Sequence, residues 1–173
     1  MAGIALVPED RKTQGLVLQM TGASNIAMTN YRLVSRFGIL SAKALTKRSR
    51  EVGGRFGFDR DRLTTIVRNL SGGNQQKILL AKWGFDPPKV LLVDEPTRGI
   101  DIGAKQEILR TLRQMATQGL AILIVSSELE EVVTVCDRIL VMAEGRVVAH
   151  LDHKVAPVRV EHILNAVFKV ATE

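Results

Sequence analysis

Two short runs built only from apolar residues, 90–93 and 121–125, are separated by a helical pattern over about 103–118. That helix carries apolar side chains on one face and charged ones on the other, so it packs along one stripe. Strands that are apolar throughout and alternate with helices are typical of parallel sheets buried on both faces. A further apolar strand, Ile4–Val7, and a helix over about 73–84 come earlier in the chain. We therefore expect an α/β fold whose parallel, twisted sheet is covered by helices on both faces.

The segment between about 24 and 58 has a different, mostly helical pattern, broken near Gly38 and at Gly53-Gly54. This segment predicts a helical subdomain. The C-terminal part predicts a turn at Glu144-Gly145 between two strands. Its predicted elements are a helix over 128–135, strands over 138–142 and 147–151, and a last amphipathic helix over about 160–170.

Composition places the chain among globular proteins, because 46% of its 173 residues are apolar and 24% are charged. The longest apolar runs are far shorter than the roughly 18 residues that a membrane helix needs. Cys136 is the single cysteine, so no disulfide can form within these residues, and a small buried hydrophobe is the expected role.

The net charge of +6 comes from one stretch, Arg32–Arg62, which holds nine basic and three acidic residues. A concentration of this kind fits a solvated helical face, an acidic protein partner, acidic lipid or nucleic acid. Few aromatic residues lie among these charges to stack on bases. We therefore place a solvated face or a protein partner ahead of nucleic acid.

Residues 70–77, Leu-Ser-Gly-Gly-Asn-Gln-Gln-Lys, form the most informative segment. Ser71 is placed to cap the helix that follows, and Gly72 and Gly73 let a ligand approach the backbone closely. The first amides of a helix lack intrahelical acceptors and carry the positive end of its dipole, which suits phosphate. Taken alone, the same pattern also fits an ordinary capped helix.

Two adjacent carboxylates, Asp94 and Glu95, follow the apolar run 90–93 where the predicted strand leaves the sheet. Ligands bind outside the carboxyl ends of strands in open α/β sheets. There Asp94 can hold hydrated Mg²⁺, and Glu95 can polarise a water for in-line attack on phosphorus. The alternative is a polar strand end without a ligand, which two acids directly after four apolar residues disfavour. Downstream, Gly99-Ile100-Asp101 predicts a tight turn before the next helix.

These segments together resemble the ATPases of ABC transporters. Residues 70–77 resemble the signature loop of that family, 91–97 its Walker B strand and 98–101 its D-loop. A narrower resemblance is to the second nucleotide-binding half of bacterial monosaccharide importers of the ribose, galactose and xylose type. This narrower resemblance rests on segments that occur in the same order as in those importers: Val7–Lys12, Gly15-Leu16, 73–77 and 95–101. The resemblance implies part of a P-loop NTPase core plus a helical subdomain.

In that family two nucleotide-binding domains sandwich ATP head to tail. The resemblance implies that one set of residues contacts ATP held by a second ABC domain: Ser71, Gly72, Gly73, Asn74 and Gln75. It also implies Mg²⁺ at Asp94, a catalytic base or water-orienting role for Glu95, and a D-loop role for Asp101.

The resemblance further implies how the chain is organised and what it meets. Residues 17–69 correspond to the helical subdomain, and 70–173 to the signature helix and Walker B core. The expected partners are a second nucleotide-binding domain, membrane permease subunits and, indirectly, a periplasmic sugar-binding protein. The expected location is peripheral, on the cytoplasmic face of the bacterial inner membrane.

Three departures from the family pattern bear on activity. Glu9 stands at the Q-loop position, which generally holds Gln, and Ser127 stands at the switch position, which generally holds His. The sequence contains no Gly-Lys dipeptide and hence no Walker A loop. We therefore expect residues 1–173 to be the C-terminal portion of one nucleotide-binding domain that hydrolyses ATP negligibly alone. The alternatives are a non-transport ABC protein that acts on nucleic acid or ribosomes, and an inactive fragment.

Overall fold

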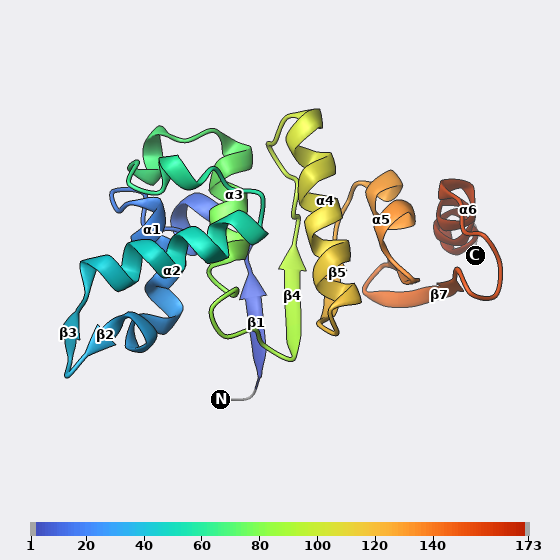
Figure 1. Cartoon of the computed structure of the whole chain (residues 1–173). Helices are drawn as coiled ribbons and strands as arrows, with labels where there is room; N and C mark the ends of the chain where they lie inside the picture. Colours follow the sequence, from blue (N-terminus) through green and yellow to red (C-terminus); the bar gives the residue numbers. More distant parts are fainter. Residues whose placement is uncertain (1–2, 172–173) are drawn as a thin grey trace. The chain divides into compact units, whose positions relative to one another are not determined.

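The computed structural model of the chain describes residues 3–171 and divides into two compact units, Met1–Val125 and Ser126–Glu173, each with its own core. In the first unit a mostly helical segment is inserted between the first and second strands of a parallel sheet (Figure 1). Its elements are, in chain order, β1 (Ile4–Val7), η1 (Arg11–Gly15), α1 (Gly22–Ala27), η2 (Met28–Val34), β2 (Ser35–Arg36), β3 (Ile39–Leu40), α2 (Ala42–Arg55), η3 (Arg60–Arg62), η4 (Val67–Asn69), α3 (Gly72–Ala81), β4 (Val90–Asp94), α4 (Ile102–Thr117) and β5 (Ala121–Val125).

The sheet of the first unit consists of β1, β4 and β5 in that order, with both pairings parallel. The register places Leu6 beside Leu92 and Leu92 beside Leu123. The predicted strands and the predicted α/β class are therefore confirmed. One continuous core joins the sheet to α3 and α4, through residues that include Leu91, Val93, Ile78, Leu79, Ile108 and Leu112.

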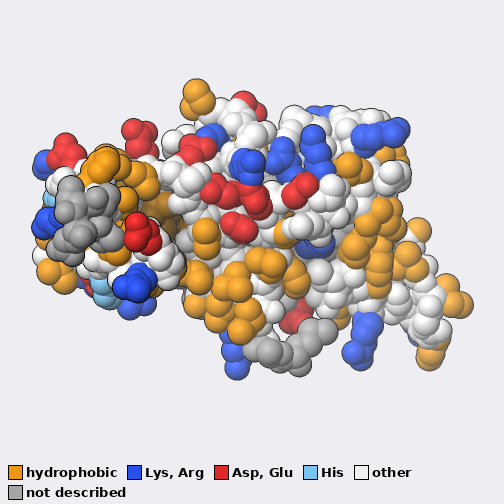
Figure 2. Space-filling view, turned by 180° about the vertical axis from the view of Figure 1, so that it is seen from behind, with side chains coloured by type: hydrophobic (Ala, Val, Ile, Leu, Met, Phe, Trp, Pro, Cys, Tyr) orange, Lys and Arg blue, Asp and Glu red, His pale blue; other side chains and the backbone are white. Residues whose placement is uncertain are grey.

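The two faces of this sheet differ in exposure. Along β1, buried Ala5 and Val7 alternate with exposed neighbours, and the buried pair shares its core with α3 and α4. The other face holds the exposed apolar side chains: Ile4 (60% exposed), Leu6 (52%), Leu123 (54%) and Val125 (59%). Figure 2 shows apolar side chains gathered across this side of the molecule. Within the described residues of the first unit, α3 and α4 pack on one face of the sheet, and the expected helical cover of the second face is not seen there.

The helical segment combines α1, η2 and α2 with a β2–β3 hairpin that the sequence pattern did not predict. The predicted break near Gly38 is confirmed, since Phe37 and Gly38 form the hairpin turn. The predicted break at Gly53-Gly54 lies close to the observed end of the helix, because α2 includes both glycines and ends one residue later, at Arg55.

The second unit contains a two-stranded antiparallel sheet and two helices. The turn at Glu144-Gly145 is confirmed, with both φ angles positive, as a two-residue hairpin turn requires. The elements are α5 (Leu129–Val135), β6 (Arg138–Ala143), β7 (Arg146–Asp152) and α6 (Val160–Ala171), which match the predicted positions. Ile139, Val141, Val158 and Ile163 form its buried core. Across the residues described in both units, no helix is long and apolar enough to cross a bilayer.

Candidate functional site

α3 begins at the segment predicted to bind phosphate. Ser71 caps this helix as predicted, because its Oγ accepts hydrogen bonds from the Asn74 backbone N–H (3.4 Å) and from Asn74 Nδ2 (3.1 Å). Ser71 is exposed, whereas Gly73 is buried. The start of α3 therefore presents the Ser71 hydroxyl to solvent at the positive end of the helix dipole, a position that suits an anion.

Gly73 brings the start of α3 against the start of α4. A Cβ at Gly73 would lie 2.5 Å from the Ala104 Cβ, so even alanine does not fit without movement. α4 begins just after Asp101, whose Oδ1 accepts the Ala104 N–H at 2.9 Å. The predicted signature and D-loop segments are thus direct neighbours, and Asp101 has a capping role there.

Arg11 joins these two segments from a third part of the chain. Its guanidinium donates to Arg98 O (2.8 Å), to Gly99 O (3.3 Å) and to Gln75 Oε1 (3.4 Å). A Cβ at Gly72 would lie 2.8 Å from Arg11 Nη2 and 3.2 Å from Gly99 O, so the glycine leaves room for both groups to approach α3 closely. Burial lowers the pKa of the Arg11 guanidinium below its ordinary value, and the nearby Asp10 carboxylate opposes that shift. Sequence reasoning did not single out Arg11; its only signal was a place in the 7–12 motif.

Glu9, the residue at the Q-loop position, forms an ion pair with Arg98. Its neighbour Asp10 caps η1, accepting hydrogen bonds from the backbone N–H groups of Lys12 and Thr13 and from the Thr13 hydroxyl. The bond from the Thr13 hydroxyl is the main reason that the pKa of Asp10 is lowered. Glu9 and Arg11 therefore contact the D-loop from adjacent places on one loop.

Gln75, one of the residues predicted to contact nucleotide, is buried and its carboxamide points into the domain. Its Nε2 donates to Val67 O (3.1 Å) and Leu70 O (3.2 Å), while its Oε1 accepts from Arg11. The carboxamide thus holds the loop that precedes Ser71. This contact set makes Gln75 a positioning residue for the exposed start of α3.

Asp94 and Glu95 lie where β4 leaves the sheet. Asp94 is half-buried and in register with Val125, on the open face of the sheet. The chain turns at Glu95, which has a φ of 44°, a left-handed conformation uncommon for any residue other than glycine. The Glu95 N–H donates to Val125 O at 2.8 Å, which holds this turn against β5.

The oxygen donors at this strand end fit Mg²⁺. Mg²⁺ is bound by one or two carboxylates, with phosphate and water as its other ligands. The residues that the structure describes include no group of three or more His, Cys, Asp or Glu side chains suited to a metal. The Asp94 carboxylate is the kind of oxygen donor that Mg²⁺ uses when phosphate and water complete its ligands.

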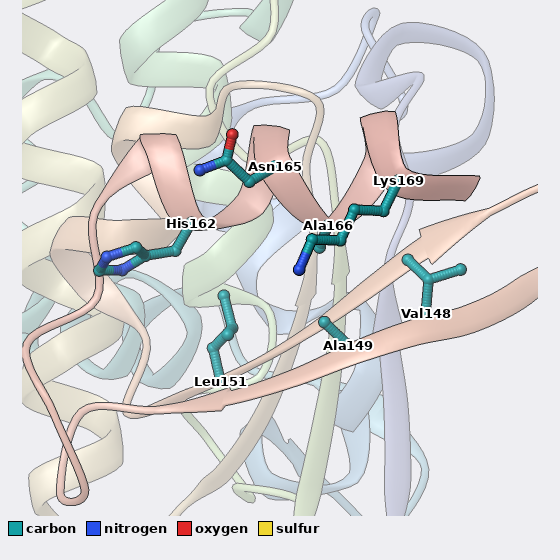
Figure 3. Close-up of a pocket in the computed structure, with 7 residues that line it drawn as sticks. All are labelled: Val148, Ala149, Leu151, His162, Asn165, Ala166 and Lys169. Atoms are coloured by element: carbon teal, nitrogen blue, oxygen red, sulfur yellow. The ribbon is translucent and has the colours of Figure 1, made fainter. Parts of the chain in front are cut away.

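Ser127, the residue at the switch position, lies in the second unit, where it precedes α5. The second unit also holds a cavity of about 480 Å³ between β7 and α6 (Figure 3). None of the residues predicted to bind nucleotide or metal lines it; the lining residues are Val148, Ala149, Leu151, His162, Asn165, Ala166 and Lys169. Among the described residues that line the cavity there is no carboxylate, unlike at the end of β4, where Asp94 and Glu95 lie.

The α/β core and the segments at its strand ends place the chain in a known class of proteins. Residues 2–98 match the sequence profile of the family described as ABC transporter, which is more than half of the chain. The chain belongs to the ABC transporter family.

Relatives in that family include named sugar-import proteins. The chain is 49% identical over 151 residues to the ribose import ATP-binding protein RbsA 1 of Streptomyces coelicolor, covering 87% of this chain and 30% of that protein. It is 45% identical over 145 residues to the xylose import ATP-binding protein XylG of Geobacillus kaustophilus, covering 84% of this chain and 29% of that protein. The chain thus spans about 30% of the length of these relatives.

Solved structures share the fold. The structure of cbiO1 from Clostridium perfringens, described as part of the ABC transporter complex cbiONQ, superposes with a TM-score of 0.72 at 26% identity, covering 88% of this chain and 58% of that one. A dimeric post-hydrolysis structure of the ATP-binding cassette MJ0796, bound to ADP and Pi, gives a TM-score of 0.69 at 21% identity, covering 86% and 62%. The α/β fold class expected from the sequence is therefore confirmed.

Proposed function

We propose that this chain is part of the ATP-binding component of a bacterial monosaccharide importer, in which ATP binding and hydrolysis drive transport. The proposal is supported by membership of the ABC transporter family and by the identity to ribose and xylose import proteins. The observation that carries it is the exposed, Ser71-capped start of α3, which Arg11 ties to the D-loop.

In this proposal the start of α3 binds the γ-phosphate of ATP held by a second nucleotide-binding domain. The Ser71 hydroxyl donates a hydrogen bond to it, and the amides of Gly72 and Gly73 face it with the positive end of the helix dipole. Asn74 holds the Ser71 Oγ, and Gln75 holds the preceding loop. Hydrogen-bond donors preorganised in this way stabilise charge on a phosphoryl group without reorganisation.

At the chain's own nucleotide, Asp94 would hold Mg²⁺ and Glu95 would accept a proton from the attacking water or orient it. Mg²⁺ supplies charge neutralisation between the phosphates when it is bound. Asp101 fixes the D-loop by capping α4. The Q-loop position, Glu9, is paired with Arg98, and the switch position holds Ser127, which lacks the imidazole that the family uses. We therefore propose that this site hydrolyses ATP more slowly than one with Gln and His.

The partners follow from the same assignment. Residues 17–69 would act as the helical subdomain that docks on the permease, and 70–173 as the signature and Walker B core. A second nucleotide-binding domain would supply the ATP that faces Ser71. A periplasmic sugar-binding protein would act through the permease, and the chain would work at the cytoplasmic face of the inner membrane.

The Ser71→Arg variant tests this proposal in the intact importer subunit. If Ser71 faces ATP, a bulky cation fills the space of the γ-phosphate, and we expect ATP-driven domain closure and ATPase activity to be lost. Ser41→Arg controls for the stability cost of losing a helix cap, because Ser41 caps α2 through the same kind of bond, from Ala44 N–H at 3.3 Å. Both variants should lose about 0.5–2 kcal/mol of stability. Closure and turnover of Ser71→Arg at the wild-type level would remove Ser71 from the nucleotide site.

A further inference from the structure

The β2–β3 hairpin presents large apolar side chains to solvent at the end of the helical segment, away from the sheet (Figure 1). Phe37 is 91% exposed, Ile39 75% and Leu40 47%. We call these three residues the hairpin tip. Isolated exposed apolar residues are common on soluble proteins, but three within one four-residue stretch form a patch that points to a binding surface.

The backbone at the tip is unfavourable for the residue that occupies it. Phe37 and Gly38 are the two central residues of the turn, with φ angles of 52° and 79°. Turns of this type favour Asn-Gly or Gly-Gly, and a bulky residue rarely adopts positive φ. Neither folding nor packing therefore accounts for an aromatic ring at position 37. Arg36 lies beside it, with its guanidinium carbon 5.4 Å from the ring centre.

A basic groove of about 560 Å³ begins three residues after the tip. It lies along α2 and η3 and is lined by Lys43, Thr46, Lys47, Arg50, Glu51 and Arg60. Four of these six side chains are cationic, and the one acidic residue among them does not balance the charge. Lys43 and Lys47 are exposed and one helical turn apart, so they lie on one face of α2.

We propose that the hairpin tip and the basic groove bind an anionic lipid surface, with Phe37 and Ile39 entering the interface and Lys43 and Lys47 facing headgroup phosphates. An apolar group beside a cluster of cations is what such a surface requires, since each alone binds weakly. A nucleic acid would use the charges and stack on Phe37, but leaves the exposed Ile39 and Leu40 unexplained. A protein partner, including the permease proposed above for residues 17–69, would have to supply an acidic patch next to an apolar one, and the experiment below distinguishes it. The proposal is independent of the nucleotide role of Ser71.

The primary experiment measures co-sedimentation of the chain with vesicles of phosphatidylcholine and with vesicles of equal parts phosphatidylcholine and phosphatidylglycerol. We expect binding to the anionic vesicles that weakens as salt is raised. Lys43→Glu/Lys47→Glu should weaken it roughly 20-fold or more, given about a fivefold contribution per cation. Phe37→Ser/Ile39→Ser should weaken it about tenfold.

Matched control variants separate this surface from non-specific binding through charged or apolar residues elsewhere on the chain. Arg110→Glu/Arg146→Glu makes the same change in net charge on exposed residues elsewhere. Ile102→Ser/Val155→Ser removes apolar side chains that are 82% and 86% exposed. Both control pairs should bind anionic vesicles as the wild type does.

A second measurement reports on insertion directly. Phe37→Trp is made in a Trp83→Phe background, so that the tip carries the single tryptophan. Its emission should shift to the blue with anionic vesicles, while Val155→Trp in the same background should not shift. Equal binding to both vesicle types, control variants as weak as the test variants, or binding confined to vesicles that carry a permease would each overturn the proposal. The last result would assign the surface to a protein partner.

Discussion

Replacing Arg11 with methionine keeps a long side chain and removes every donor of the guanidinium. The lost hydrogen bonds reach Arg98 O at 2.8 Å, Gly99 O at 3.3 Å and Gln75 Oε1 at 3.4 Å. Each intramolecular hydrogen bond contributes about 0.5–1.5 kcal/mol net, and the two carbonyls are exposed enough to regain water. We therefore expect the free energy of unfolding of the first unit to fall by about 1–3 kcal/mol.

Amide hydrogen exchange shows which segments lose stability in Arg11→Met, whereas thermal unfolding reports only the total. Because Arg11 ties the D-loop to the start of α3, the amides of 98–104 and 71–75 should exchange about tenfold faster or more in Arg11→Met. Arg11→Lys keeps a positive charge, but one ammonium cannot span three acceptors on two segments. Its exchange rates should therefore lie between those of the wild type and those of Arg11→Met.

Arg110→Met is the control for this prediction, because it removes an exposed arginine from α4 without touching either loop. It should leave exchange at both segments at the wild-type rate. Unchanged exchange in Arg11→Met would refute the argument that these hydrogen bonds hold the loops together. Faster exchange spread evenly over the whole unit would show instead that Arg11 stabilises the fold without a specific role at the site.

Two further predictions concern packing and pH. Gly73→Ala should lower the free energy of unfolding by about 1–3 kcal/mol, because its Cβ would meet the Ala104 Cβ at 2.5 Å. Adding Ala104→Gly should restore most of that loss, and a double variant as unstable as the single one would contradict the contact. Burial lowers the pKa of Lys82 below the 10.5 of an unperturbed lysine, so the unfolded chain binds more protons between the two pKa values. Stability relative to Lys82→Met should therefore rise with pH across that window in urea titrations, and a difference that is flat with pH would disprove the assignment.

Much of the regular structure could be read from the sequence because its causes are local. Apolar strands 4–7, 90–93 and 121–125 and the helix that Ser71 caps all follow from neighbouring residues. A capping side chain accepts a hydrogen bond from a backbone amide three positions away, and the apolar residues of an amphipathic helix recur about once per helical turn. The signature, Walker B and D-loop segments were found for the same reason, since each is a short run of fixed residue types.

The hairpin at 35–40 could not be read in this way. Its turn places Phe37 where Asn or Gly is favoured, so the sequence indicated only a break near Gly38. The end of α2 was predicted to within one residue, because Gly53 and Gly54 immediately precede its last residue, Arg55.

Sequence alone predicted which segments carry the proposed chemistry: a capped helix start at Ser71 and a strand that ends in Asp94 and Glu95. Tertiary structure decided how these segments are held, through Arg11, whose hydrogen bonds cross 64 to 88 positions of the chain. It also decided which face of the sheet α3 and α4 cover, although the strands are apolar on both sides. The physical reason is that apolar periodicity and helix capping are patterns among neighbouring residues, which a sequence displays directly. Hydrogen bonds between loops and the covering of a sheet face depend on which distant segments the fold brings together.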